Sequence, residues 1–162
     1  MFFDKYDERI RFSSPVSGEV TEIVRGAKRR IMEVKIAADA EVRYESFSID
    51  ANASREQIIK GLLDSGVWPF IRQKPFDIIA NPSDNPKAIF ISTFDTAPLA
   101  PDNDFVLHGL DEEFQMGIDV IKKLTDGKVH LNVDGNTNPS KVFTDCKGCL
   151  LYTSPSPRDS CA

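Results

Sequence analysis

The residues best suited to chemistry in this sequence are its cysteines and histidines. Cys146 and Cys149 are separated by two residues in a C-x-x-C arrangement, the spacing of thioredoxin-like dithiols. His108 and His130 are too few and too widely separated to predict a metal site. The sequence contains no glycine-rich dinucleotide loop, no Walker loop and no nucleophile elbow. We therefore expect neither an independent nucleotide site nor catalysis by this chain alone.

The segment from Cys149 onward is expected not to be native protein sequence. Residues 149–159 match, residue for residue, the translation of a transposon-type sequencing adapter. The segment also lacks a hydrophobic period and a helix cap. Residues 149–162 are therefore excluded from the fold prediction, as a cloning scar would be. On this interpretation the dithiol spacing is accidental, and Cys146 is an ordinary core or surface thiol.

Five residues are candidates for ligand binding. Trp68, Arg72 and Phe76 combine flat apolar surface with a cation, a mixture that can stack an aromatic ring. A small interdomain core has the same composition, and this is the favoured interpretation. Asp95 and Thr96 follow a buried strand, at the end where α/β proteins place ligands. Asp95 could hold a ligand hydroxyl or a cation there, or it could equally accept hydrogen bonds from its own loop.

A cluster of cations lies in an expected hairpin turn of a chain whose net charge is −5. Its members are Arg25, Lys28, Arg29 and Arg30. Such a cluster can dock an acidic partner or lipid head groups, although a solvated hairpin is the simpler interpretation. Biotinyl and lipoyl carriers present a modified lysine at a comparable tip, but Lys28 lacks the hydrophobic neighbours that those carriers have.

The composition is that of a folded protein without a membrane span. Hydrophobic residues make up 41% of the chain, which is enough to build a core. The acidic balance argues against nucleic acid as the main partner. No apolar run approaches the roughly 20 residues that cross a bilayer, and charged residues follow Met1-Phe2-Phe3 at once. We expect a cytoplasmic chain with an indirect membrane link.

Residues 1–48 are predicted to form a compact β module. Short strands are expected around residues 10–12, 20–24 and 31–36, with a tight turn at Arg25-Gly26-Ala27. Val42, Tyr44 and Phe47 alternate with polar residues and predict one more strand. Short strands separated by Pro and Gly are typical of a sandwich or part of a barrel.

Residues 49–148 are predicted to form an α/β domain. Ser54 and Gln57 have the spacing of a capping box at the start of a helix, and Gly66 can end that helix. A buried strand is expected over residues 88–94.

A second helix is expected over residues 110–125 and a second strand over 129–133. Gly127 is expected to cap this helix. Strand, helix and strand in this order imply a parallel pair.

Five stretches, in this order, resemble the NqrA family, the A subunits of sodium-translocating NADH:quinone reductases. They are Phe2–Lys5, Phe12–Val20, Arg25–Arg30, Ser65–Phe76 and Asp95–Ala100. The resemblance spans about residues 2–148. It implies a mixed α+β and α/β fold, with a partial barrel-sandwich hybrid module followed by a Rossmann-like α/β domain.

The resemblance also implies a role within a larger complex. The family's complex passes electrons from NADH through flavins and iron–sulfur centres to ubiquinone and moves sodium outward. The NqrA component is associated with quinone reduction and with assembly on the cytoplasmic face of the bacterial inner membrane, where it is peripheral. The resemblance thus makes the five ligand-binding candidates, Trp68, Arg72, Phe76, Asp95 and Thr96, candidates for the quinone end. Flavins, iron–sulfur centres and NADH belong to other subunits, so this chain is expected to bind no cofactor or metal itself.

The sequence departs from the family pattern in several places. The family begins before Met1 and continues beyond Gly148, so a chain truncated at both ends, and poorly folded alone, is expected. Gln73 and Lys74 stand where the family often has threonine and arginine.

Two rival interpretations stay open. The chain could be a carrier-like or adaptor module without a redox role, marked by a modified Lys28. It could also be the related component of a ferredoxin-reducing electron-transport complex. That component has four clustered cysteines, whereas Cys146 is the only cysteine before the adapter-like tail.

Overall fold

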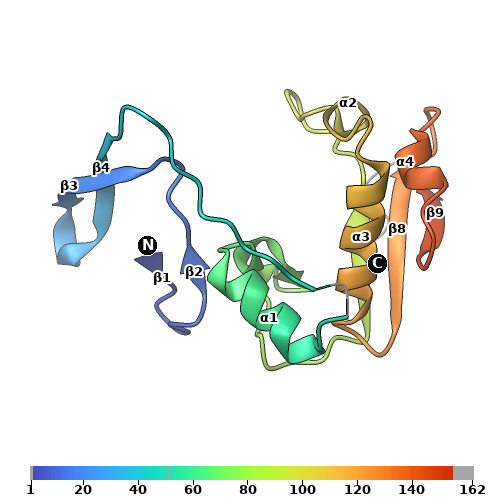
Figure 1. Cartoon of the computed structure of the whole chain (residues 1–162), viewed down its shortest axis with the longest axis horizontal. Coiled ribbons are helices and arrows are strands. Elements are labelled where there is room, and N and C mark those ends of the chain that lie inside the picture. The colour runs from blue at the N-terminus through green and yellow to red at the C-terminus, as the bar shows by residue number, and fades with distance from the viewer. Residues whose placement is uncertain (1, 51, 155–162) are drawn as a thin grey trace. The chain divides into compact units, whose positions relative to one another are not determined.

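The computed structural model describes residues 2–50 and 52–154, and its contacts divide the chain into two compact units. The first unit runs to Ser48 and includes Gly61–Phe70 (Figure 1). The second unit takes Ile49–Lys60 and the chain from Ile71 onward. The predicted domain boundary lies near Ile49, with residues 149–162 excluded; within the predicted α/β domain, Gly61–Phe70 packs in the first unit. There an Arg11–Asp64 ion pair at 3.0 Å helps to hold it.

The first unit is built from two short antiparallel sheets. Strand β1 (Phe2–Phe3) pairs with β2 (Arg11–Phe12). Strand β3 (Gly18–Arg25) forms a longer hairpin with β4 (Ile31–Ala38), and the strands predicted here are confirmed. In its register Val20 lies opposite Ile36, and Ile23 lies opposite Val34. These apolar side chains therefore meet across the two strands.

The strand predicted from Val42, Tyr44 and Phe47 is wrong. Among the described residues between β4 and the first helix, none belongs to a strand. These three side chains are half or more exposed, with Tyr44 at 87%. Alternation supplies the side-chain pattern of a strand, but a strand also needs a partner for its backbone groups. Here Arg43 instead pairs with Asp39 at 2.7 Å and holds the segment locally.

Helix α1 (Arg55–Asp64) begins and ends as its sequence predicts. Ser54 and Gln57 form the capping box at its start. At its end Gly66 adopts the left-handed conformation with φ 75°, and its N–H donates to the Leu63 carbonyl at 3.3 Å. A side chain at Gly66 would also meet Ser13 at 3.0 Å. Glycine is therefore required both by the backbone and by the close approach of Ser13.

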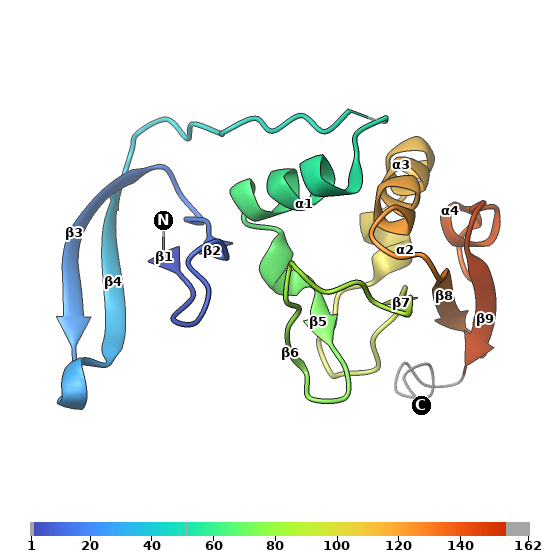
Figure 2. The same ribbon diagram turned by 90° about the horizontal axis from the view of Figure 1, so that it is seen from below.

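The second unit contains a parallel sheet in the order β7-β8-β9 (Figure 2). Strand β7 (Ala88–Ser92) is joined to β8 (Lys128–Asp134) through helix α3 (Asp111–Lys122), so the predicted strand–helix–strand unit with a parallel pair is confirmed. The short helices α2 (Asn103–Val106) and α4 (Lys141–Thr144) were not predicted. Each is capped by the side chain before it, Asp102 and Ser140 respectively. The core cluster consists of Leu131, Val133, Val142 and Phe143.

Strand β9 (Leu150–Ser154) lies in the segment that was excluded from the fold prediction. It pairs in parallel with β8, from Leu150 opposite His130 to Ser154 opposite Asp134. Its leucine and tyrosine side chains are 39–49% exposed, so backbone pairing, together with the stacking of Tyr152 on His130, holds it rather than side-chain burial. The unpaired edge of a buried strand accepts extended backbone of many sequences. Residues 155–162 of the excluded segment lie outside the described residues.

Gly127 does not cap α3 as expected. The chain leaves the helix through Lys123 and Leu124, whose N–H groups donate to Val120 and Ile121. A Cβ at Gly127 would come within 1.8 Å of the Lys87 carbonyl oxygen. Glycine is needed at this position because the start of β7 passes so close to it.

Candidate functional site

Trp68 is a core residue of the first unit. It lies in a 3-10 turn, η2 (Trp68–Phe70), which follows α1 and contacts β2. Its exposed fraction is only 4%, whereas that of Phe70, two residues later, is 82%. The flat faces of the indole are therefore buried, and Phe70 is the aromatic ring that this turn exposes.

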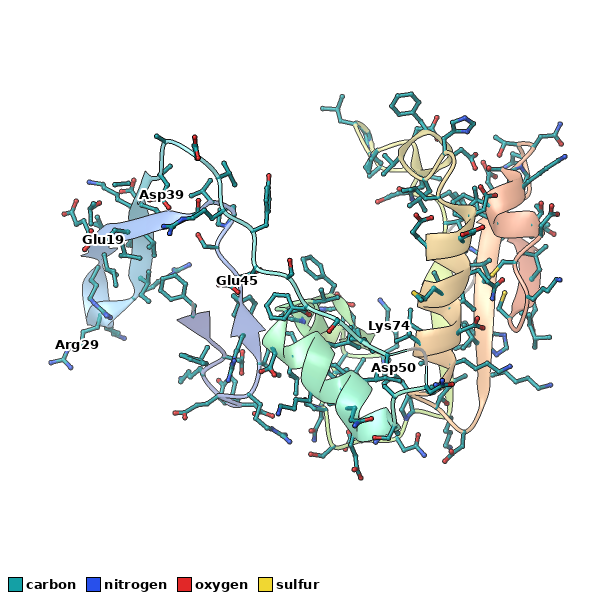
Figure 3. All side chains as sticks on the ribbon, in the orientation of Figure 1. Glu19, Arg29, Asp39, Glu45, Asp50 and Lys74 are labelled. Carbon is teal, nitrogen blue, oxygen red and sulfur yellow. The ribbon has the colours of Figure 1, made fainter. Side chains whose placement is uncertain are left out.

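Arg72 and Phe76 belong to a tight hairpin of the second unit. Strand β5 (Arg72–Gln73) pairs with β6 (Ile78–Ile79), and Phe76 in the turn is 76% exposed. Both cations of the hairpin turn toward Asp77. Arg72 donates to the Asp77 carbonyl, and Nζ of Lys74, labelled in Figure 3, lies 3.1 Å from its carboxylate. The hydrogen bond and the charge of Lys74 lower the pKa of the Asp77 carboxyl.

Asp95 and Thr96 are exposed in the loop that follows β7. The Asp95 carboxylate accepts a hydrogen bond from the Ala97 N–H at 2.9 Å, so it orders its own loop. The loop is anchored further back, where the amide of Asn103 donates to the Thr93 carbonyl at 2.9 Å. Asp95 keeps a second carboxylate oxygen for an external partner.

The five quinone-end candidates do not form one site within either unit. Trp68 belongs to the first unit, and the other four belong to the second. Within residues 71–96, no hydrogen bond or ion pair joins Arg72 or Phe76 to Asp95 or Thr96. The exposed ring of Phe76 on its hairpin and the Asp95 carboxylate after β7 are therefore two separate features.

The basic residues, by contrast, are brought together at one end of the β3–β4 hairpin. Arg25 ends β3, and the 3-10 turn η1 (Ala27–Arg29) carries Lys28 and Arg29. Figure 3 shows Arg29 pointing outward from this turn. Arg30 directly follows the turn, so the four cations predicted as a docking patch lie within one turn of chain.

His130 and Asn132 form a polar feature that the sequence did not single out as functional. The His130 ring stacks between Phe90 and Tyr152, with ring centroids 4.6 and 5.3 Å away. Asn132 is only 2% exposed, and neither its amide nitrogen nor its amide oxygen has a hydrogen-bond partner among the described residues. A buried amide without partners is costly. The signal in the sequence was an asparagine inside an apolar strand.

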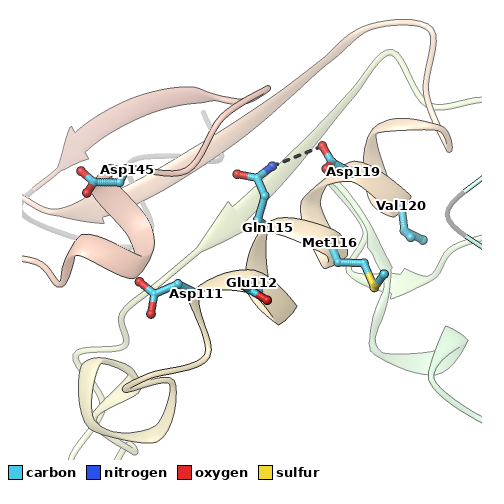
Figure 4. A pocket seen from close by; sticks show the side chains of 7 residues that line it. All are labelled: Asp111, Glu112, Gln115, Met116, Asp119, Val120 and Asp145. Carbon is cyan, nitrogen blue, oxygen red and sulfur yellow. Dashed lines mark hydrogen bonds between the residues drawn. The ribbon is translucent and has the colours of Figure 1, made fainter.

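An open hollow beside α3 is lined mainly by acidic residues (Figure 4). Its lining consists of Asp111, Glu112, Gln115, Met116, Asp119, Val120 and Asp145. The Gln115 amide nitrogen donates to the Asp119 carboxylate at 3.2 Å and to the Lys147 carbonyl, and the Gln115 amide oxygen accepts from the Lys147 N–H. Gln115 thus holds the 145–148 loop in place. None of the quinone-end candidates lines this hollow.

The thiols of Cys146 and Cys149 are both free and half-buried. Burial, followed by the neighbouring Cys149, raises the pKa of Cys146 to about 12. A thiol of such high pKa is a poor nucleophile at neutral pH, because the thiolate is the reactive species. The C-x-x-C spacing is therefore not accompanied by the activated thiol of a dithiol enzyme.

Neither a metal cluster nor a membrane-spanning helix is found in residues 2–50 and 52–154. They contain no group of three or more His, Cys, Asp or Glu side chains that could hold a metal ion. Within the same residues, no helix has the length and apolar character needed to span a bilayer.

Comparison with known proteins assigns most of the chain to two known domains. Residues 1–39 match the NqrA N-terminal barrel-sandwich hybrid domain, and residues 53–148 match the NqrA second alpha/beta domain. The A subunit of the Na(+)-translocating NADH-quinone reductase of Aliivibrio salmonicida is 38% identical over 143 residues, which cover 86% of this chain and 32% of the relative. The corresponding protein of Yersinia pestis is 36% identical over 158 residues, covering 91% of this chain and 35% of that protein.

The chain thus spans about a third of the length of the curated relatives it matches. The matched domains confirm the fold class, a barrel-sandwich hybrid module followed by an α/β domain. Since both domains match in order and the identity extends over most of the chain, it belongs to the NqrA family, the A subunits of Na(+)-translocating NADH-quinone reductases.

Proposed function

We propose that the chain works as part of one component of a Na+-translocating NADH:ubiquinone oxidoreductase, peripheral on the cytoplasmic face of the membrane. The observation that carries this proposal is the match of two NqrA domains in succession. The relatives bear the name of the A subunit of such a reductase. In this role the chain assembles with the other subunits of the complex, which hold NADH, flavins and iron–sulfur centres.

The contribution of this chain is to dock and shape the quinone end of the complex. Phe76 offers an exposed ring in the turn of the hairpin whose first strand carries Arg72, and aromatic rings and cations can both stack on a quinone. Asp95 and Thr96 supply polar groups at the end of β7, where α/β folds bind ligands. Trp68, which is 4% exposed in the first unit, stabilises that unit and is not proposed to contact the quinone.

Photoaffinity labelling with a ubiquinone analogue tests this proposal. The chain is added to a reductase preparation from a relative that has been depleted of its own NqrA, and the labelled peptides are identified by mass spectrometry. We expect adducts on the peptides that contain Phe76 or Asp95, and competition by unmodified ubiquinone. A chain that neither joins the depleted complex nor acquires label would overturn the proposal.

A further inference from the structure

We infer that the turn of the β3–β4 hairpin is a docking site for an acidic protein segment on another component of the complex. The site consists of Arg25, Lys28, Arg29 and Arg30, called here the basic tip. This inference rests on the proposed function for the existence of the complex, and it adds the surface and the chemistry of its partner.

The backbone of the basic tip has a defined conformation that displays its side chains. Lys28 and Arg29 have positive φ angles, 55° and 61°. Residues other than glycine seldom adopt this backbone conformation. The turn is closed by a hydrogen bond from the Gly26 N–H to the Arg30 carbonyl at 2.8 Å. Two successive residues with positive φ are a requirement of tight hairpin turns, so this conformation fixes the turn that carries the cations.

The charges of the basic tip are not used within the described structure. All four side chains are exposed, and none of them forms an ion pair with an acidic residue of the described ranges. Arg25 donates only to the Arg29 carbonyl, at 3.3 Å. On the same hairpin Lys35 behaves differently, because it pairs with Glu22 at 2.6 Å. The positive field of the tip is therefore directed to solvent.

The composition of the hairpin favours a protein partner over a lipid surface. Three of the four cations are arginines, whose planar fork matches the geometry of a carboxylate. Ile31 and Met32 follow the cations and are 46% and 63% exposed, which supplies apolar area beside the charges. The strands behind the tip also carry Glu19 and Glu33, which are exposed, form no ion pair within the described residues, and would be repelled by an anionic bilayer.

Binding to the NqrA-depleted reductase in detergent, measured by biolayer interferometry, tests the basic tip. The test variant carries Arg25→Gln, Lys28→Gln, Arg29→Gln and Arg30→Gln. The matched control carries Lys60→Gln, Lys87→Gln, Lys128→Gln and Lys141→Gln, which changes the net charge equally at exposed positions elsewhere. Circular dichroism of all three chains establishes that they share one fold.

We expect the test variant to bind about tenfold or more weakly, and the control within about twofold of the unsubstituted chain. The difference is expected to shrink in high salt, because exposed charges are screened. If the test variant binds as tightly as the unsubstituted chain, the inference that the basic tip is a docking site is wrong, and the proposed function stands. Failure of the unsubstituted chain to bind the depleted complex would overturn both.

Vesicles of phosphatidylcholine, with and without phosphatidylglycerol, distinguish the lipid alternative. We expect little binding to either. If the tip substitutions abolish binding to anionic vesicles but leave binding to the depleted complex unchanged, the tip is a lipid site and the inference is wrong.

Discussion

Ser54 and Gln57 bond to each other reciprocally at the start of α1. The Ser54 N–H donates to Oε1 of Gln57 at 2.9 Å, and the Gln57 N–H donates to Oγ of Ser54 at 3.4 Å. Each side chain thus satisfies a backbone donor that the helix itself leaves without a partner. This pair fixes where the helix begins.

Substitution of Ser54 by alanine is expected to lower the free energy of unfolding by about 1 kcal/mol, the usual cost of losing a helix cap. Urea denaturation followed by circular dichroism measures the change. Lys60→Ala, at an exposed position of the same helix, serves as the control and is expected to be close to neutral. An unchanged midpoint for Ser54→Ala would show that the cap does not stabilise the fold.

The core of the second unit depends on Phe143. Its side chain is 1% exposed and packs edge-on against Phe114, with centroids 5.2 Å apart. Phe143→Ala is expected to lower the free energy of unfolding by about 3–5 kcal/mol, because it removes buried area and leaves a cavity. Phe105→Ala is the matched control, since Phe105 is 82% exposed and should tolerate truncation. Thermal melts of both variants make the comparison; similar melting temperatures would contradict this view of the core.

The Asp77 carboxyl is predicted to titrate below its ordinary range. Its pKa is lowered mainly by the hydrogen bond from Lys74 and, to a smaller extent, by the charge of Arg72. The favourable interaction is therefore present above the unfolded pKa and lost as the pH falls through the folded pKa. NMR titration of the carboxyl should show its pKa rising more in Lys74→Gln than in Arg72→Gln. The opposite order would mean that Arg72 is the main partner.

The sequence predicted those helices and strands whose signals lie within the element itself. The capping box of α1, the glycine at its end and the strand–helix–strand unit all depend on patterns within one element, and all three are present. The predicted strand at Val42–Phe47 failed because strand formation depends on a partner, which alternation does not reveal.

Prediction of the candidate site was limited for a similar reason. The basic tip was foreseen because its four cations are close in sequence, and a hairpin keeps them close in space. The quinone-end candidates come from separate segments, and sequence spacing could not tell that Trp68 belongs to a different unit from Arg72. Nor could it show that the Arg72 charge is shared with Asp77, since that contact depends on the turn of a hairpin.

Cys146 is expected to resist alkylation in the folded chain. Its pKa is raised from 9.0 to about 12, first by burial and then by Cys149. Folding therefore favours the protonated thiol, and this contribution to stability is present below the unfolded pKa and lost as the pH rises toward the folded value. At pH 8, iodoacetamide should react with Cys146 at least about tenfold more slowly in the folded chain than in urea.

Mass spectrometry of the labelled peptides follows the reaction. Cys149→Ser should speed labelling of Cys146, because it removes the neighbouring thiol that contributes to the raised pKa. Equal rates in the folded and unfolded chains would contradict the burial of this thiol.

The pairing of β9 with β8 is predicted to depend on backbone rather than on side-chain identity. Leu150, Leu151 and Tyr152 remain 39–49% exposed, whereas Val129, Leu131 and Val133 of β8 are almost fully buried. Removal of residues 149–162 would leave one edge of this buried strand unpaired, and unpaired edges promote association. Size-exclusion chromatography with light scattering should therefore detect concentration-dependent oligomers of the chain that ends at Gly148.

A full-length chain with Leu150→Val and Leu151→Thr tests whether β9 pairs with β8 through its backbone even without the leucine side chains. Both replacements favour extended backbone, so the strand pairing should persist and the substituted chain should elute like the unsubstituted chain, although the leucine side chains are gone. If the substituted chain associates like the shortened one, the leucine side chains and not the backbone hold β9. If the shortened chain stays monomeric and melts sharply, the β8 edge does not need a partner, and the adapter-like segment contributes nothing to the fold.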